Sequence, residues 1–452
     1  MAPQKNPRVS LTRPMALIHE ILTSALVEAV WKRRRTVERV RVWGLEQLAN
    51  FWIAVSFHAP ASLRRALSDG LGTTSSPYRV PECSPQSLFA RSQRLSWRFM
   101  ADLFEAFRAR AVVQAPRTFA RELAPLFRRF HAIEAVDGSR LDPVRRRLKI
   151  LWKDRRSVIP GSLLAFYDLA TGTVARLTFA SHAMASEFRG AVKLFAQIPP
   201  GTLLVGDRLY GVVRFFEALS HRGLFGVARR FSVVTIRPIR RLSKKLHEGA
   251  VLEDWEVLAG SGQTAAPQTL RRICLKRRGK TAIEVLTNVL DPHRLSATEA
   301  LMLYRHRWTV ERLFSDLKEV LRLDRLYGAN VNAVATQVYA ALILHTALRI
   351  AQAIAAREAR VAPEVISTKK FFPKAATASA NLIGWESGFL ATARLNPQYD
   401  LKEPNWNRMK GASTTLDEIR VEVRRSPKGR SQRRPGIRAW RAWPRRARKR
   451  PP

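Results

Sequence analysis

Three acidic residues in the middle of the chain could together hold divalent metal ions. Asp137 follows the short apolar run HAIEAV, Asp207 follows TLLVG, and Glu311 lies in a stretch with helical periodicity. Hard cations such as Mg²⁺ take anionic oxygen ligands, and two such ions about 4 Å apart can stabilise the attacking and leaving oxygens of a phosphate. A single aspartate at a strand end is more often a turn residue. Three carboxylates meeting in a basic protein would instead indicate metal-dependent phosphoryl transfer.

The stretch that must position Glu311 is residues 296–328, SATEALMLYRHRWTVERLFSDLKEVLRLDRLYG. Ser296, followed three residues later by Glu299, forms a capping box and predicts that a helix starts here. At about 100° per residue one face is apolar and should be buried. That face holds Met302, Leu303, Val310, Leu313, Phe314, Leu317, Val320 and Leu321. A stripe along its border holds Tyr304, Arg307, Glu311 and Lys318.

The simpler interpretation of this stripe is a solvated polar face. Pairs four residues apart, such as Arg307 with Glu311, stabilise ordinary surface helices. For an isolated helix that interpretation would be favoured. The two upstream aspartates, Asp137 and Asp207, allow a more specific interpretation of this stripe to be checked.

The two aspartates need strands that end next to each other. HAIEAVDGSRL predicts a strand that delivers Asp137 at its C-terminal end, and TLLVG predicts one that runs straight into Asp207. Between them, SLLAFYDL and VARLTF predict a hairpin that turns at residues 170–172, and residues 186–197 predict a helix. Adjacent parallel strands place their C-terminal ends side by side, so we expect Asp137 and Asp207 to meet.

The stripe resembles the Tyr-Arg-Glu-Lys signature of DDE transposases of the insertion-sequence-four type, which move by a cut-and-paste route through a DNA hairpin. Its four residues are separated by two, three and six positions. The motifs AVDGS, VGDRLYG and VLTNVLDP are also similar to motifs of that family, and the resemblance covers roughly residues 131–330. One position departs from the pattern, because Leu209 stands where Gly is commoner after the Asp-Arg pair.

The resemblance implies an α/β fold with a ribonuclease H-like catalytic core, in which Asp137, Asp207 and Glu311 are the catalytic residues and metal ligands. Two Mg²⁺ ions would be the cofactors, with Mn²⁺ as a possible substitute. One ion would activate water for the first nick; the freed 3′-hydroxyl would then form a hairpin that opens before strand transfer. The implied partners are double-stranded transposon ends and target DNA, held by a homodimer in the synaptic complex.

Five residues are candidates for DNA contacts. By resemblance, Tyr304, Arg307 and Lys318 grip the phosphates of the transposon end, and Arg307 is the best placed for bidentate contact. Arg208, beside the second aspartate, is a further candidate. Trp255 is nominated to stack on a flipped base, although a Trp in an alternating strand is more often a core residue.

The domain organisation follows from shifts in periodicity. A helical pattern precedes the first aspartate, and five strand-like runs lie between the second aspartate and the Glu311 helix. The predicted units are 1–130, a helical N-terminal DNA-binding domain; 131–222, the first part of the core; 223–295, an inserted mainly-β domain; 296–358, the rest of the core; and 359–452, a C-terminal region with a basic, largely disordered tail.

The composition favours a polyanionic partner. The 452-residue chain has 79 Lys and Arg against 36 Asp and Glu, a formal net charge of +43, which is far more than solubility requires. No apolar run of about 20 residues is free of charged or strongly polar residues, so a membrane partner is not expected. The closest approach, residues 333–356, predicts a buried helix. Two unrelated cysteines and no secretory signal predict a protein of the reducing cytoplasm. The resemblance implies that this cytoplasm is bacterial and that the protein is associated with the nucleoid.

The tail from Arg424 carries 13 positive charges and no acidic residue. It is expected to be disordered alone and to bind phosphates without sequence preference, and Trp440 and Trp443 could stack on bases. A solubilising tail or a translation-frame artefact is the competing interpretation.

Two other functions stay open at this point. A structure-selective nuclease of the same fold would need the three carboxylates but not the Tyr-Arg-Glu-Lys stripe. A non-catalytic nucleic-acid binder, or a decayed copy of a transposase, would carry the aspartates incidentally. Metal-dependent cleavage separates the enzymes from the binder, and strand joining separates the transposase from the nuclease.

Overall fold

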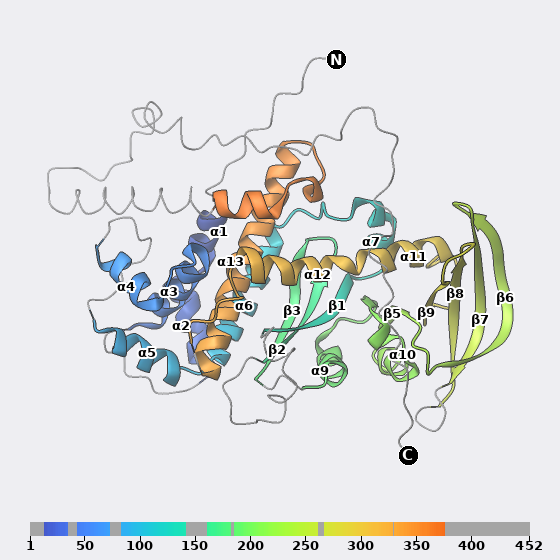
Figure 1. The fold of residues 1–452 in the computed structure, drawn as a ribbon, viewed down its shortest axis with the longest axis horizontal. Coiled ribbons are helices and arrows are strands. Elements are labelled where there is room, and N and C mark those ends of the chain that lie inside the picture. The colour runs from blue at the N-terminus through green and yellow to red at the C-terminus, as the bar shows by residue number, and fades with distance from the viewer. Residues whose placement is uncertain are drawn as a thin grey trace, which may run out of the picture.

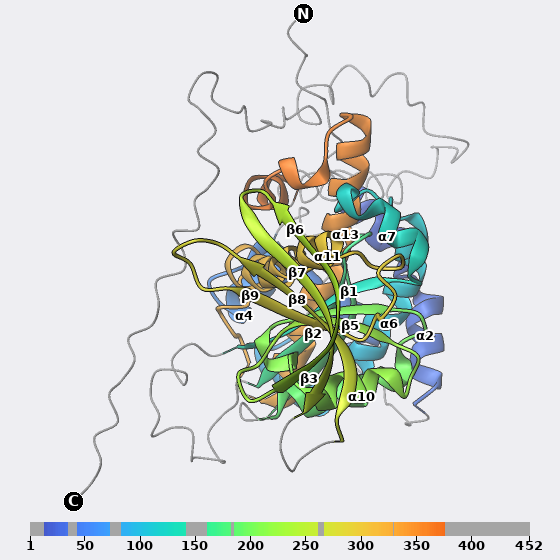
Figure 2. The same cartoon turned by 90° about the vertical axis from the view of Figure 1, so that its right-hand side faces the viewer.

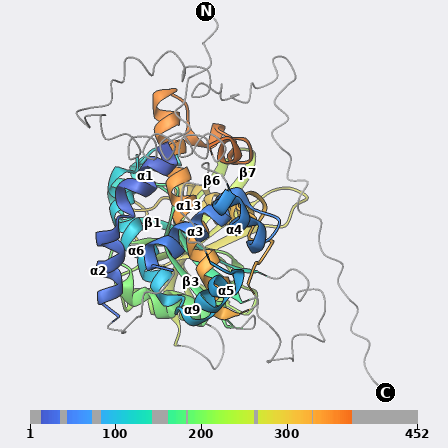
Figure 3. The ribbon, with the colours of Figure 1, turned by 90° about the vertical axis from the view of Figure 1, so that its left-hand side faces the viewer.

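The computed structural model describes residues 13–34, 43–72, 83–141, 161–181, 185–260, 266–328 and 330–375 (Figure 1). Within these residues, nine strands form one mixed sheet in the order β3-β2-β1-β4-β5-β9-β8-β7-β6. A group of N-terminal helices lies at one end of this sheet, and the long helix α13 runs between the group and the sheet (Figures 1 and 3). The chain is therefore a mixed α/β protein.

The N-terminal part is helical, as the periodicity predicted. Its helices are α1 (Arg13–Ile21), α2 (Ser24–Lys32), α3 (Leu45–His58), α4 (Leu63–Gly72), α5 (Pro85–Arg94), α6 (Arg98–Ala111) and α7 (Ala124–Arg129). Helices α1, α3, α5 and α6 contact α13 (Figure 3). Their apolar faces share one hydrophobic cluster with one face of the sheet, so this part packs as a continuation of the core.

The strands that lead to the two aspartates, and the strands beside them, form in the expected order. They are β1 (Ile133–Arg140), β2 (Ser162–Asp168), β3 (Thr173–Ala180), β4 (Leu203–Gly206) and β5 (Phe225–Arg229). Strands β1, β2 and β3 are antiparallel neighbours, while β4 pairs in parallel with both β1 and β5. The β2–β3 hairpin turns where predicted, and Gly172 adopts the positive φ of 67° that such a turn favours.

Helices cover both faces of this part of the sheet. The side chains of Val136 and Leu204 pack into one hydrophobic cluster with α9 (Glu187–Leu194) and α10 (Val213–Ser220). Those of Ala135 and Val205 point the other way and share a cluster with α11 (Ala297–His306), α12 (Trp308–Ser315) and α13 (Val331–Glu358). Because successive side chains alternate across a strand, odd-numbered positions of β1 and β4 face the Glu311 helix.

The five strand-like runs predicted after the second aspartate all form strands. The last four are β6 (Thr235–His247), β7 (Ala250–Gly260), β8 (Gln268–Lys276) and β9 (Ile283–Thr287), an antiparallel set. The structure differs from the predicted division at residue 223, because β5 pairs with β4 inside the core sheet. The set β6–β9 extends that same sheet through the β5–β9 pair, with β6 at the free edge (Figure 2).

The stretch that carries Glu311 begins as predicted but is not one regular α-helix. It consists of α11 (Ala297–His306), α12 (Trp308–Ser315) and a π-helical turn, η7 (Asp316–Val320). Ser296 and Glu299 make the predicted capping box. At Arg307 the backbone hydrogen bonds tighten to a spacing of three residues. The π turn that follows widens the spacing to five residues, so the directions of the later side chains around the axis change again. A uniform 100° winding therefore describes this stretch only approximately.

The buried helix predicted at residues 333–356 is α13 (Val331–Glu358), followed by the short turn η8 (Pro363–Val365). Within the part of the chain that the structure describes, α13 alone is long and apolar enough to cross a membrane, and 89% of its most apolar window is buried in the protein. It is therefore the central helix of the core. Residues 376–452, which include the basic tail with Trp440 and Trp443, lie outside the described residues.

Candidate active site

Asp137 and Asp207 lie at matching distances beyond the paired part of two adjacent parallel strands. Ala135 on β1 is paired with Val205 on β4, and each aspartate lies two residues further along the chain, Asp137 within β1 and Asp207 just past the end of β4. Both therefore stand on the face of the sheet that α12 covers. The expectation that Asp137 ends its strand is wrong, because β1 continues to Arg140 by pairing with β2. Only the pairing of β1 with β4 stops before Asp137.

Arg307 links the third carboxylate to the first. Helix α12 packs against β1, and the Nη1 atom of Arg307 lies 2.6 Å from Oε1 of Glu311 and 3.6 Å from Oδ2 of Asp137. The Arg307 side chain is 9% exposed and also stacks on Trp308, with its guanidinium carbon 4.6 Å from the ring centroid. Glu311 and Asp137 thus share one buried cation.

The carboxyl group of Asp137 has a strongly raised pKa. Burial, together with the negative charges of Glu187 and Asp207, raises its pKa from the ordinary value of 3.8 to about 7. The backbone N–H of Gly138 and the charge of Arg307 oppose this shift. Like charges that crowd one another in a partly dry site disfavour ionisation, and a bound cation would relieve that repulsion.

The loop after Asp207 is a short 3-10 turn, η5 (Arg208–Tyr210), capped by the aspartate itself. The backbone N–H of Leu209 donates to Oδ1 of Asp207 at 2.7 Å. Arg208 is exposed and lies over the ring of Phe231, at 5.2 Å from its centroid. The unusual Leu209 therefore takes part in the cap through its backbone, which any residue could supply.

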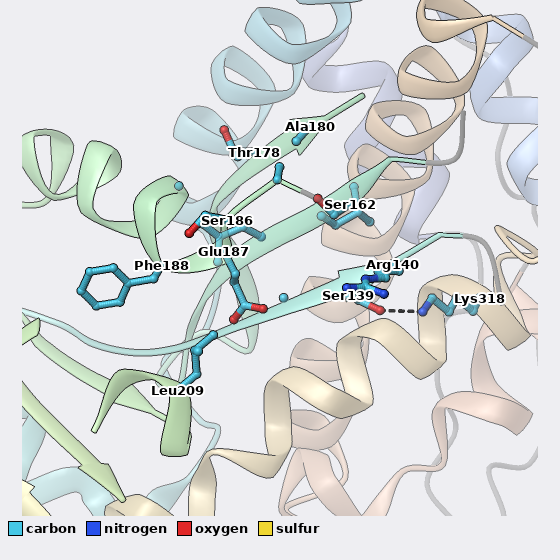
Figure 4. Close-up of a pocket in the computed structure, with 15 residues that line it drawn as sticks. Ser139, Arg140, Ser162, Thr178, Ala180, Ser186, Glu187, Phe188, Leu209 and Lys318 are labelled. Carbon is cyan, nitrogen blue, oxygen red and sulfur yellow. Dashed lines mark hydrogen bonds between the residues drawn. The ribbon is translucent and has the colours of Figure 1, made fainter. Parts of the chain in front are cut away.

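The remaining stripe residues border the same site. Lys318, carried by the π turn, donates from Nζ to Oγ of Ser139 at 2.5 Å, two residues beyond Asp137 on β1 (Figure 4). Tyr304 is half-buried beside Arg307, and burial raises its phenol pKa. The structure thus brings Arg307 and Lys318 to the Asp137 strand.

Trp255 is not part of this arrangement. It lies on β7, which is separated from β4 by three strands, and its half-buried ring packs against the hydrophobic cluster of α9 and α10. The guanidinium of Arg241 lies 5.8 Å from the centroid of that ring. A role in base stacking stays a prediction.

Sequence reasoning missed a fourth carboxylate. Glu187 is the first residue of α9, and the hydroxyl of Tyr210 donates to its Oε1 at 2.8 Å. Burial raises the pKa of Glu187, and the charge of Asp207 adds to this shift. An acidic residue after a Ser cap is common in the first turn of any helix. The sequence Ser186-Glu187-Phe188 therefore did not distinguish Glu187 as a site residue.

A cleft of about 660 Å³ opens beside the carboxylates (Figure 4). Glu187, Leu209 and Lys318 approach it from three separate elements, together with Ser139 and Arg140 of β1. Its charged lining residues are Glu187, Arg140 and Lys318. Asp137, Asp207 and Glu311 are not among the residues that line this cleft, although Gly138 and Leu209, close to the two aspartates in the chain, are.

The donor set suits a hard divalent cation, because it consists of carboxylate oxygens, and burial with the charges of neighbouring carboxylates raises the pKa of Asp137. In the described arrangement no group of three or more His, Cys, Asp or Glu side chains is close enough to hold an ion. Glu311 is instead paired with Arg307. A metal centre would therefore require Glu311 to exchange that pair for the ion.

Residues 145–347 match the family described as the transposase DDE domain. The matched range contains Asp207 and Glu311 and begins after Asp137. Over 158 residues the chain is 33% identical to a putative transposase, y4zB, of Sinorhizobium fredii, which is 34% of this chain and 44% of the relative. Over 194 residues it is 27% identical to a probable transposase for insertion sequence element IS5377 of Geobacillus stearothermophilus, 42% of this chain and 48% of that one.

The chain thus spans less than half the length of these relatives. A cryo-EM structure of the piggyBac transposase synaptic complex with hairpin DNA aligns over 95% of this chain and 90% of its own, at 10% identity and a TM-score of 0.37, a similarity too low to define a shared fold. The family match and the two relatives support a DDE transposase domain. They do not distinguish the insertion-sequence-four type.

Proposed function

We propose that this chain is a DNA transposase of a bacterial insertion sequence of the insertion-sequence-four type. It would catalyse cut-and-paste transposition by strand nicking, hairpin formation and opening, and strand transfer. The observation that carries the proposal is the parallel pairing of β1 with β4, whose last pair, Ala135 with Val205, stands two residues before Asp137 and Asp207. The transposase DDE domain match over residues 145–347 supports it independently.

A ribonuclease H-like core is supported by the sheet itself. The order β3-β2-β1-β4-β5, with an antiparallel β1–β3 meander and parallel β4 and β5, agrees with that fold. Asp137, Asp207 and Glu311 would hold Mg²⁺, or Mn²⁺ in its place. When bound, these ions would supply Lewis-acid stabilisation of the attacking and leaving oxygens of the phosphate.

The protein groups around the carboxylates would bind and orient the DNA. Arg307 can leave the carboxylates as their charge is neutralised, and its planar guanidinium then suits a phosphate of the transposon end. Lys318 and Tyr304 would contact neighbouring phosphates, and Arg208 is exposed at the other side of the site. Burial around Arg307 would exclude water and strengthen each of these contacts.

Partners and location follow from the same proposal. Double-stranded transposon ends and target DNA match the net charge of +43, and a homodimer would hold two ends together in the synaptic complex. The protein would act in the bacterial cytoplasm, associated with the nucleoid. Its N-terminal helices would contribute to end recognition.

The test is a strand-cleavage and strand-joining reaction with the full chain, DNA that carries the inverted repeats of its own element, and Mg²⁺. We expect nicking, a hairpin intermediate and joining to a target plasmid. Cleavage without joining would favour a nuclease of the same fold, and binding without metal-dependent cleavage would leave only a DNA-binding protein.

A further inference from the structure

We propose that Glu187 and Tyr210 form a positioning pair that fixes Asp137 and Asp207 relative to each other. This inference rests on the proposed transposase function and concerns residues outside the Asp-Asp-Glu set. The hydroxyl of Tyr210 donates to Oε1 of Glu187 at 2.8 Å. Tyr210 ends the turn that Asp207 caps, and Glu187 begins α9, so the bond ties the Asp207 loop to a separate helix.

The other end of the pair reaches the strand of Asp137. A Cβ atom built on Gly138 would lie 2.3 Å from Oε2 of Glu187, a distance that no real side chain could tolerate. The Glu187 carboxylate therefore rests on the backbone of the residue that follows Asp137. Any larger residue at position 138 would push Glu187 away.

The tyrosine ring makes a matching contact at the second aspartate. A Cβ atom built on Gly206, the residue before Asp207, would lie 2.7 Å from Cβ of Tyr210 and 2.9 Å from its ring atoms. Two glycines, one beside each catalytic aspartate, thus make room for the two members of the pair. Tyr210 is fully buried and also packs on Phe215, with ring centroids 5.2 Å apart.

Packing alone does not account for a carboxylate here. Glu187 adds a negative charge to a group that already holds Asp137 and Asp207, and burying an acid beside other acids is unfavourable. An apolar side chain would fill the same space without that cost. The tyrosine hydroxyl offsets part of it and fixes the orientation of the carboxylate, as hydrogen-bonded groups outside the ligand set do at other metal sites.

The test compares full-length Tyr210→Phe, Glu187→Gln and the double variant with the wild type. Tyr210→Phe removes the hydroxyl that donates the bond, and Glu187→Gln weakens the bond by removing the charge of its acceptor. Both substitutions change the shape of the side chain little. We expect turnover of nicking to fall about 10- to 100-fold and the Mn²⁺ concentration for half-maximal binding, measured by electron paramagnetic resonance without DNA, to rise. The KM for the end duplex should stay unchanged. The double variant should lose no more than the worse single variant, because the two groups act as one.

Tyr327→Phe is the matched control. Its hydroxyl also donates a hydrogen bond, at 2.6 Å to the backbone oxygen of Pro60, but far along the chain from both aspartates, and its Mn²⁺ binding should equal that of the wild type. A Tyr210→Phe variant with wild-type turnover and Mn²⁺ binding would overturn the inference and leave the proposed function intact. A wild-type protein that shows no metal-dependent cleavage would overturn both.

Discussion

The Nη1 atom of Arg307 lies 2.6 Å from Oε1 of Glu311, one helical turn further along the chain. The same nitrogen lies 3.6 Å from Oδ2 of Asp137. In the arrangement described, Arg307 therefore supplies the positive charge that these two carboxylates need. The proposed metal centre and the proposed phosphate contact both require this arginine to give up that position.

Arg307→Gln should weaken binding to end duplex and to random duplex alike. Loss of one phosphate contact should reduce the slope of log affinity against log salt by about 1. Fluorescence anisotropy across a salt series measures both quantities. Arg305→Gln makes the same charge change at an exposed position of α11 and should change affinity less. Equal effects of the two variants would remove the specific role given to Arg307.

The raised pKa of Asp137 predicts a pH-dependent stability without divalent metal. Its folded-state pKa of about 7 lies above the ordinary 3.8, so this group's stabilising contribution is complete below about pH 4 and is lost as pH rises through about 7. Asp137→Asn, which resembles the neutral form, should therefore melt at a higher temperature than the wild type at pH 8. The difference between the two melting temperatures should decrease toward pH 4.

Calorimetry in chelator at several pH values checks this, with roughly 1 °C expected for each kcal/mol by which the substitution stabilises a chain of this length. Asp324→Asn, at an exposed side chain that is 48% accessible, is the control and should show no such trend. Adding Mg²⁺ should stabilise the wild type more than Asp137→Asn. A difference in melting temperature that stays constant from pH 4 to pH 8 would contradict the raised pKa of Asp137.

Several features of the fold were accessible from local patterns. Short apolar runs predicted the strands that lead to both aspartates, and the Ser296–Glu299 capping box marked the helix start because its hydrogen bonds are local. The adjacency of β1 and β4, the strands that lead to Asp137 and Asp207, followed from the order of the elements.

Other features depend on contacts that no local pattern records. The π turn that carries Lys318 to Ser139 breaks the winding without any proline or glycine inside it. The continuity of β6–β9 with the core depends on which strand β9 pairs with. Glu187 resembles an ordinary first-turn acid, and only its distance from Gly138 places it at the site.

The basic tail should contribute affinity without specificity. Its 13 cations after residue 423 should act by counterion release, which weakens steeply with salt. A chain truncated before Arg424 should therefore bind random duplex more weakly at low salt and show a shallower salt slope, yet keep its preference for its own ends. Binding of both proteins to end and random duplexes across a salt series decides this. If the truncated protein instead loses its preference for the ends at every salt concentration, the tail recognises the end sequence.

The most direct measurement of the central claim is a denaturing-gel assay of end-labelled transposon-end DNA with wild-type protein and Glu311→Gln in Mg²⁺. The substitution removes one ligand charge without changing shape. We predict that the wild type produces nicked, hairpin and then opened products, and that Glu311→Gln produces none while its affinity for the end duplex stays nearly that of the wild type. Cleavage by Glu311→Gln at the wild-type rate, or loss of binding with cleavage retained, would contradict the assignment of Asp137, Asp207 and Glu311 as one catalytic centre.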